Sequence, residues 1–457
     1  MTARVPAMRS LSCVLLLTAS PVLAQTLTLQ QPVISRFGTG TSVSAPSFGG
    51  VAIDAGGVLS NKNAIRVNSK LERERLRKSA KSSLTADMFR TSKLRKVSLA
   101  GLEAELRKLV ESRQPIPADV FHLAGLNRVE YVLADPENND IIIAGPAEGF
   151  AATKSGAVVG IESGRPTLVL DDLLVMLRLP TMQQTLGVSF DPDKARLAKA
   201  QAWFQSSPDA SNAREAKRQF RQMADMLGNW DVKLFGLPPT SHAALRMADA
   251  DFQMKRVNLG LRRTGIRKFK SQLDMMKPTD NSMRRFWFSP RYNQIEQSTG
   301  GDVFRLSGPR LQLLSQEELA DAKGNRSQAA FKEVSTEAYT RQFNKHIDEL
   351  CQRIPAFAAL QNVFDMAIVA ALIRKHDLFS KAKWKPVFLL DDKVLQTAQC
   401  PAPKQVPSQM NSRIEKRTAV LFQIAGGVTM VPTAVIEKTR SLEKGPELKR
   451  NGSWWWD

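Results

Sequence analysis

The chain has 457 residues and a formal net charge of +21, because 65 lysines and arginines outnumber 44 aspartates and glutamates. Its hydrophobic content of 43% and its ordinary glycine and proline content exclude intrinsic disorder and a collagen-like structure. Three cysteines and four histidines are too few for a disulfide-rich scaffold and give little material for a metal site. A chain of this length can bury a large core without such supports.

The N-terminus has the pattern of a secretory signal peptide. Two early arginines supply a basic region, residues 11–18 form a short apolar stretch, and Val22–Ala24 offers the small residues that signal peptidase requires. We therefore expect residues 1–24 to be removed on export and residues 25–47 to form a flexible leader. The mature protein would be periplasmic or extracellular, and no remaining apolar run is long enough for a transmembrane helix.

Export would place the two remaining cysteines, Cys351 and Cys400, in an oxidising compartment. A disulfide between them would close a loop and contribute about 4 kcal/mol of stability through the entropy of the unfolded chain. Two buried thiols are the alternative, and the sequence alone leaves both interpretations open.

Two short segments carry most of the excess positive charge. Residues 61–96 hold 12 basic and 3 acidic residues, and residues 254–285 hold 10 basic and 2 acidic residues. Such clusters favour an anionic partner, although a solvated charged face has the same composition. Each segment has a single aromatic residue, which argues against nucleic-acid binding by base stacking. The candidate anion-binding residues are Arg73, Arg75, Arg77 and Lys78 in the first segment, and Arg262, Arg263, Arg267, Lys268 and Lys270 in the second.

Residues 48–180 are expected to be rich in strands. The alternation around a glycine pair predicts a small hairpin at residues 48–59. Ser98 is placed to cap a helix with leucines on one face. Asp171 and Asp172 are expected to cap a second, short helix that ends near Leu179. Further strands are predicted at residues 128–134, 140–144, 157–161 and 167–170.

The remaining chain is expected to alternate between helical and strand-rich parts. Residues 181–325 contain predicted helices at 192–227, which Gly228 ends, and after Thr240 or Ser241, and then a β-meander at 284–314. Residues 326–457 contain predicted helices at 336–353 and 356–375, and strands at 410–432. The order predicts an α+β fold with a strand-rich N-terminal block, central helices, a β-meander, a C-terminal helical pair and closing strands.

Several segments resemble a family of exported bacterial proteins catalogued as a domain of unknown function. They are Gly49–Asp54, Asp140–Gly149, Gly164–Pro166 with Leu170–Leu173, Ala248–Arg256 and Leu360–Ile373. The resemblance covers roughly Phe48 to Pro432 and implies one large exported unit. It implies no activity, because the family has none assigned.

Motifs for common catalytic and cofactor chemistry are missing from the sequence. It contains no HExxH pair or Cys/His cluster for zinc, no GxSxG nucleophile motif, and no Walker or GxGxxG phosphate loop. We therefore predict neither a metal nor a cofactor. His242 is interpreted as a residue at a helix N-terminus.

Carboxylates are the remaining catalytic candidates. Glu148 lies between turn glycines, and Asp171 and Asp172 follow further along the chain. Paired carboxylates hydrolyse glycosides when they are suitably separated, which makes these three residues the candidate catalytic groups. Helix capping explains the two aspartates without catalysis. The loop at 135–140 has oxygen ligands suited to Ca²⁺, but a plain Asp- and Asn-rich turn explains it as well.

Two functional hypotheses follow. The first is a non-catalytic binding or structural protein of the cell envelope, which contacts an anionic envelope component or an acidic protein through the two basic segments. The second is a carboxylate-dependent hydrolase, directed at a glycan, that uses Glu148 with Asp171 or Asp172. Whether the protein is an enzyme stays open. The aromatic run at 454–456 suits a partner contact, a membrane interface or a frayed tail.

Overall fold

The computed structural model describes residues 51–54, 56–61, 70–208, 210–415, 418–447 and 455–457, which belong to one compact unit. The expected signal peptide and leader lie outside the described residues. Helices and strands are combined in mixed sheets, so the predicted α+β class is confirmed.

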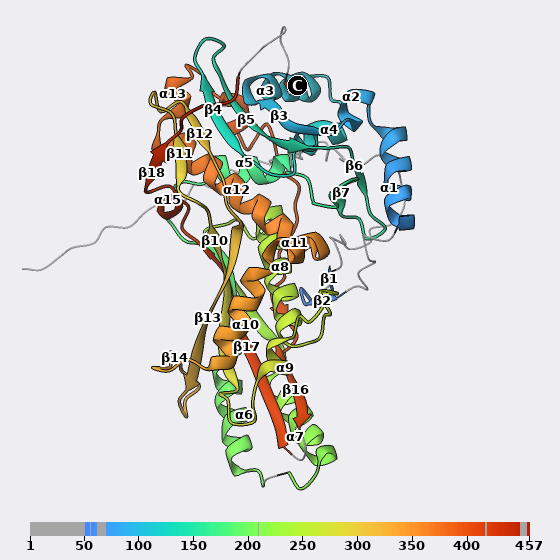
Figure 1. The fold of residues 1–457 in the computed structure, drawn as a ribbon, viewed down its shortest axis with the longest axis vertical. Coiled ribbons are helices and arrows are strands. Elements are labelled where there is room, and N and C mark those ends of the chain that lie inside the picture. Colours follow the sequence, from blue (N-terminus) through green and yellow to red (C-terminus); the bar gives the residue numbers. More distant parts are fainter. Residues whose placement is uncertain (1–50, 55, 62–69, 209, 416–417, 448–454) are drawn as a thin grey trace, which may run out of the picture. The chain divides into compact units, whose positions relative to one another are not determined.

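The larger sheet of the described residues has eight strands (Figure 1). Its central strand, β17 (Thr418–Met430), is parallel to β10 (Met283–Arg291) and antiparallel to β8 (Leu186–Asp191). A side chain at Gly426 or Gly427 would collide with a carbonyl oxygen of a neighbouring strand, so only glycine allows this close approach. The other strands are β13 (Arg310–Ala320) and β14 (Arg326–Gln328) beyond β10, β9 (Trp230–Phe235) and β15 (Gln405–Val406) beyond β8, and β16 (Met410–Glu415), which pairs with β17.

A second sheet of six strands draws on distant parts of the chain. Its spatial order is β18 (Thr439–Ser441), β11 (Ile295–Gln297), β12 (Val303–Arg305), β4 (Tyr131–Asp135), β5 (Asp140–Ala147) and β3 (Ser92–Ser98). Two short hairpins are formed by β1 (Val51–Ile53) with β2 (Leu59–Asn61), and by β6 (Phe150–Ala152) with β7 (Val158–Gly160). Both main sheets contain strands from more than one of the three predicted regions, so these regions are not separate folding units.

The helices cover the sheets and fill the space between them. α12 (Pro355–Lys375) contacts α8 (His242–Asn258) and α5 (Leu170–Arg178), and α6 (Lys194–Ser206) and α7 (Ala213–Leu227) pair beside β16 and β17 (Figure 1). The remaining long helices are α1 (Lys70–Ser83), α3 (Leu99–Glu111) and α10 (Val334–Lys345). Short helices are α2 (Ala86–Phe89), α4 (Ala118–Phe121), α9 (Gln272–Met275), α11 (Ile347–Arg353), α13 (Leu378–Lys381), α14 (Val387–Leu390), α15 (Pro432–Val435) and the 3₁₀ turn η1 (Leu123–Gly125).

The central helix α12 is the one described helix that is long and apolar enough to cross a membrane, but its most apolar window is entirely buried in the protein. Its polar side chains are used inside the fold. Asp365 accepts hydrogen bonds from the Tyr292 hydroxyl at 2.7 Å and from the Val129 N–H at 2.9 Å. Asn362 donates to the Pro166 carbonyl at 2.9 Å. These contacts and the complete burial are the pattern of a core helix in a folded domain.

The helix ends agree well with the sequence signals. Ser98 caps α3 and Ser241 caps α8 through hydrogen bonds from their side chains, and Gly228 ends α7 with a positive φ of 58°. The predicted cap by Asp171 and Asp172 is wrong, because α5 begins at Leu170 and both aspartates lie inside its first turn. The strand predicted at 167–170 does not form, and only Pro166 makes an isolated bridge there.

The predicted meander at 284–314 is correct in its strands and wrong in its connections. β10 and β13 pair with each other in the larger sheet, whereas β11 and β12 between them belong to the smaller sheet. The chain therefore crosses from one sheet to the other and back within this segment. Side-chain periodicity marks a strand but carries no information about which sheet it joins.

Candidate functional site

A cavity of about 660 Å³ lies at the end of α8, in the second basic segment. The end of α8, the loop that follows it, the start of α9 and one stretch of β16 form its wall. Its lining residues are Val257, Leu259, Gly260, Arg262, Arg263, Thr264, Gly265, Ile266, Phe269, Ser271, Leu273, Asp274, Asn411, Ser412 and Arg413. The volume is in the range of cavities that hold small ligands.

The chain turns sharply where α8 ends, and this turn shapes the cavity. Gly260 follows the helix with a φ of +72°, and Gly265 has a φ of +75°, so both positions favour glycine. The Leu261 N–H returns to the Arg256 carbonyl at 2.8 Å and closes the helix end. On the other side, Ser271 and Asp274 form a capping box that starts α9.

Three arginines line the cavity, and one of them, Arg413, is paired with a carboxylate. Arg262 donates to the side-chain oxygen of Gln253, and burial lowers the pKa of this guanidinium. Arg413 reaches in from β16 and donates to the Met276 carbonyl at 2.7 Å and to Glu415 at 2.8 Å. Arg263 is exposed at the cavity. Asp274 is the single acidic residue among the lining residues, and it accepts hydrogen bonds from Ser271.

The buried carboxylate of Asp249 is linked to Arg262 through the side chain of Gln253. Asp249 on α8 is 1% exposed and accepts a hydrogen bond from Gln253 at 3.2 Å, and Gln253 in turn accepts from Arg262. Burial raises the pKa of Asp249 to about 6, against the opposing influence of nearby arginines. These two hydrogen bonds hold the guanidinium of Arg262 in one orientation, as a preformed binding site requires.

The predicted anion-binding residues divide into two groups. Arg262 and Arg263 line the cavity, and Arg267, Lys268 and Lys270 are exposed on the same loop. On α1, Arg73 and Lys78 are exposed. Arg75 is paired with Glu72 at 2.8 Å, and Arg77 with Glu162 at 2.6 Å.

The two basic segments lie in different surroundings. α1 packs against β6 and α2, whereas α9 packs against α8, α10, β16 and β17. Figure 1 shows α1 beside β6 and β7, and α9 well away from it, between α10 and β16. The cavity is therefore lined by arginines of the second basic segment and of β16. The basic residues of α1 lie on a different part of the surface.

Glu148 holds a turn in place. Its buried carboxylate accepts hydrogen bonds from Asn127 at 2.8 Å, from the Glu162 N–H at 2.6 Å and from the N–H and hydroxyl of Ser163. A side chain at Gly160 would collide with this carboxylate. The contacts are those of a structural acid that satisfies the donors of a tight turn.

Asp171 and Asp172 point to different partners. Asp171 accepts from the Ala398 N–H at 2.9 Å, and Asp172 contacts Nδ1 of His242 at 2.9 Å. Nε2 of His242 accepts from Arg246 at 2.9 Å, so the ring proton belongs on Nδ1 and is donated to Asp172. The three candidate carboxylates therefore bond to three different parts of the fold: the turn after β7, the chain at Ala398, and the start of α8.

His122 is a further buried histidine in this region. Its Nδ1 lies 2.8 Å from the Thr167 hydroxyl. Burial lowers the pKa of His122 to about 3, and the positive charge of Arg246 acts in the same direction. Such a histidine stays neutral at physiological pH. Within the described residues, no group of three or more His, Cys, Asp or Glu side chains is placed to hold a metal ion.

The cysteines and the acidic loop have structural positions. Of the two interpretations that the sequence leaves open for the cysteines, the structure has two buried thiols: Cys351 and Cys400, the two cysteines among the described residues, are not bridged. Burial raises the pKa of Cys351 to about 12, so this thiol is inert at neutral pH. In the loop at 135–140, Asp135 accepts from Asn138, and Asp140 accepts from Ser98 and the Ala100 N–H. These contacts make the loop an ordinary polar turn.

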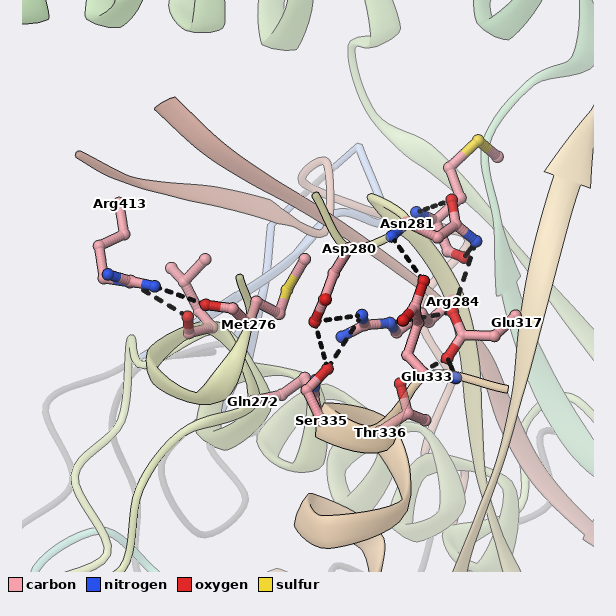
Figure 2. A network of polar contacts seen from close by, with 12 residues as sticks. Gln272, Met276, Asp280, Asn281, Arg284, Glu317, Glu333, Ser335, Thr336 and Arg413 are labelled. Atoms are coloured by element: carbon pink, nitrogen blue, oxygen red, sulfur yellow. Dashed lines mark hydrogen bonds and ion pairs between the residues drawn. The ribbon is translucent and has the colours of Figure 1, made fainter. Parts of the chain in front are cut away.

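A buried polar network lies beside α9, and no sequence motif predicts it. Figure 2 shows Arg284 on β10 between Glu317 and Asp280, at 3.0 and 3.4 Å. Ser335 joins Arg284 and Asp280, and Thr336 donates to Glu317 at 2.5 Å. Arg284 belongs to the second basic segment of the sequence, but its side chain is fully buried. Its charge is balanced by Glu317 and Asp280.

Part of the cavity lies in a segment of the chain that matches a known protein family. Residues 188–271 match the family described as Protein of unknown function (DUF1598). The DUF1598 segment runs from β8 to the start of α9 and includes ten of the fifteen residues that line the cavity. No curated protein and no solved structure matches the chain.

The predicted resemblance to a family of unknown function is confirmed for the DUF1598 segment. Of the segments that carried it, Ala248–Arg256 lies inside the match. The sequence predicted two of the three basic residues that line the cavity, Arg262 and Arg263. It predicted neither Arg413 nor the cavity itself, because Arg413 lies on a strand about 150 residues further along the chain.

Proposed function

We propose that the protein is a non-catalytic binding protein that holds an anionic group of a cell-envelope component in the arginine-lined cavity of the DUF1598 segment. The observation that carries the proposal is the gathering of Arg262, Arg263 and Arg413 around a space of about 660 Å³ with one acidic residue in its wall. Guanidinium groups bind phosphate and carboxylate through paired hydrogen bonds.

The exposed residues around the cavity support the same proposal. Arg267, Lys268 and Lys270 lie on the loop that forms the wall, and they would raise the local concentration of a polyanion. The proposed ligand is a polymer or surface with repeated negative charges, one of which enters the cavity. The export signal predicted from the sequence is the reason for proposing the cell envelope as the place of action.

The hydrolase alternative has weaker support. Glu148 is fully engaged by a turn, and Asp171 and Asp172 are engaged elsewhere. A catalytic pair would need two carboxylates that face a common substrate, and their observed partners give no reason to expect this.

Sedimentation of the purified protein with its own cell-envelope fraction, at low and high salt, tests the proposal. We expect binding that weakens steeply with salt. The informative variant is R263Q/R267Q/K270Q, and the matched control is R73Q/K78Q/K81Q on α1, which removes the same charge from exposed positions. The proposal requires a loss of binding in the first variant alone. Equal losses in both would show that net charge, and not the cavity, drives the association.

Two defined probes identify the ligand chemistry. Vesicles that contain phosphatidylglycerol offer phosphate groups, and oligogalacturonate offers carboxylates. Vesicles of phosphatidylcholine alone are the uncharged control. Binding to neither probe, with envelope binding intact, would point to an acidic protein in place of a lipid or glycan.

A further inference from the structure

The arginine-lined cavity has an apolar part in its wall. Four of the lining residues are at most 8% exposed, and all four belong to the main hydrophobic core of the protein: Val257, Leu259, Ile266 and Leu273. The same cavity is lined by the exposed residue Arg263. The cavity therefore borders both the protein surface and the hydrophobic core.

Phe269 extends the apolar part of the wall and is held in place by aromatic neighbours. Its ring lies edge-on to the rings of Tyr339 and Phe343, with centroids 6.2 Å apart in both pairs. Both neighbours are fully buried on α10. Because these contacts fix the ring, an alkyl chain can lie against it without the cost of ordering a mobile side chain.

Two uncharged polar side chains of the wall are bonded within the protein. Asn411 donates to the Leu259 carbonyl at 2.8 Å, and the Ser271 hydroxyl donates to Asp274 at 2.6 Å. A sugar ring has several hydroxyls, each of which needs a hydrogen-bond partner when it leaves water, and it would compete for these groups. An alkyl chain has no such requirement, so the wall favours an apolar ligand part over a sugar.

Positive charge lies beside this apolar surface. Arg263 is exposed, and its guanidinium makes no hydrogen bond or ion pair with another described residue. It is therefore available for the paired hydrogen bonds by which a guanidinium binds phosphate or carboxylate. Arg262 precedes it on the same loop and is held by Gln253. A ligand that suits both parts of the cavity has an anionic group attached to an alkyl chain.

Resting on the proposed function, we infer that the ligand of this cavity is a lipid with an anionic headgroup. Arg262 and Arg263 bind the headgroup, and an alkyl chain of the lipid lies against the apolar part of the wall, at Ile266, Phe269 and Leu273. The leaflet from which the lipid comes supplies the repeated negative charges that attract the exposed basic loop. An anionic glycan provides the charge but not the chain.

Calorimetric titration of the purified protein tests the inference with soluble probes, each kept below any micelle concentration. Dihexanoylphosphatidylglycerol carries the anionic headgroup and short chains, glycerophosphoglycerol carries the same headgroup without chains, and dihexanoylphosphatidylcholine carries the chains without net charge. We expect the first probe to bind at least about tenfold more tightly than either of the others. The phosphatidylglycerol with butanoyl chains should bind about tenfold more weakly than the hexanoyl form, because less apolar surface is buried.

Variants of the protein locate the binding. Arg263→Gln should weaken binding of dihexanoylphosphatidylglycerol by about tenfold. Arg267→Gln is the matched control, because Arg267 is exposed on the same loop but does not line the cavity, and it should change the affinity by less than about twofold. Ile266→Ala shortens a lining side chain and should reduce the difference between the hexanoyl and butanoyl probes. If circular dichroism shows that this variant does not fold, the chain-length comparison in the natural protein still decides.

The inference and the proposed function fail through different results. Equal affinity for dihexanoylphosphatidylglycerol and glycerophosphoglycerol would overturn the inference, and so would equal affinity for the two dihexanoyl lipids. Unchanged probe binding in Arg263→Gln would place the lipid elsewhere and would also overturn it. The proposed function depends instead on the envelope binding of R263Q/R267Q/K270Q, and it fails if that variant sediments with the envelope as the natural protein does.

Discussion

Arg284 and Glu317 are registered neighbours on β10 and β13, and their side chains meet at 3.0 Å with no exposed surface on either. Asp280 and Ser335 complete the surroundings of the arginine. A buried ion pair of this kind contributes little net stability when intact, but the loss of Glu317 would leave the buried arginine with the longer contact to Asp280 at 3.4 Å as its remaining ion pair.

We predict that Glu317→Gln lowers the free energy of unfolding by about 3 kcal/mol, because Arg284 would remain charged and buried. The double replacement Arg284→Met with Glu317→Leu should recover part of this loss, because the buried charge of the arginine is removed while Thr336 and Asp280 each lose one partner. Glu337→Gln, at an exposed position on α10, is the control and should change little. Urea unfolding of the four proteins measures the differences. A double variant as unstable as the single one would contradict this account of the pair.

The carboxylate of Glu148 is predicted to be structural. In Glu148→Gln, one oxygen becomes an NH₂ group that faces the donors of Glu162 and Ser163. We expect a loss of about 1–3 kcal/mol in stability, as for other buried donors left unpaired. Thermal unfolding followed by circular dichroism is the measurement. Unchanged stability would contradict the structural role and make Glu148 a candidate catalytic residue again.

Gly427 is predicted to be irreplaceable in the larger sheet. A Cβ there would overlap the Val188 carbonyl on β8, and backbone cannot move aside as a flexible side chain can. Gly427→Ala should therefore cost about 3 kcal/mol or prevent folding. Gly56→Ala, in the small hairpin, meets only the tip of the Asp54 side chain and is the matched control. Soluble yield and unfolding midpoints compare the two.

Stability should depend on pH through Asp249. Its pKa is raised to about 6 by burial, while the unfolded chain has the ordinary value near 3.8. The folded state therefore retains a proton that the unfolded state releases between about pH 4 and 6, and stability falls as the pH rises through this range. Two pKa units correspond to about 3 kcal/mol.

Asp249→Asn isolates this contribution, because the amide carries no charge and keeps an oxygen for Gln253. We expect the stability difference between the variant and the natural chain to grow from pH 4 to pH 7 in favour of the variant. Urea unfolding at several pH values measures it. A constant difference across the range would show that Asp249 does not titrate there.

Local signals in the sequence predicted local structure. The cap at Ser98, the cap at Thr240 or Ser241 and the end of α7 at Gly228 depend on neighbouring residues, and the structure has Ser98, Ser241 and Gly228 in these positions. The helix predicted at 356–375 begins one residue earlier, at Pro355. The cap at Asp171 failed because tertiary contacts with Ala398 and His242 compete for the two carboxylates.

Features that join distant residues could not be predicted. β17 pairs with β10 across more than 100 residues, and β11 and β12 leave the sheet of their sequence neighbours. Charge counts found the basic loop, but they could not separate Arg284, buried against Glu317, from Arg263 at the cavity. Burial decides which charges are available to a partner, and burial follows from the tertiary fold.

Arginine footprinting tests the central claim most directly. The natural protein is treated with phenylglyoxal in the presence and absence of its envelope fraction, and the modified arginines are identified by mass spectrometry. We predict that the envelope fraction protects Arg263 and Arg267 by at least about fivefold, as an occupied anion site requires, while Arg73 on α1 stays reactive. Protection of Arg73 with unchanged reactivity at Arg263 would contradict a binding site in the DUF1598 segment.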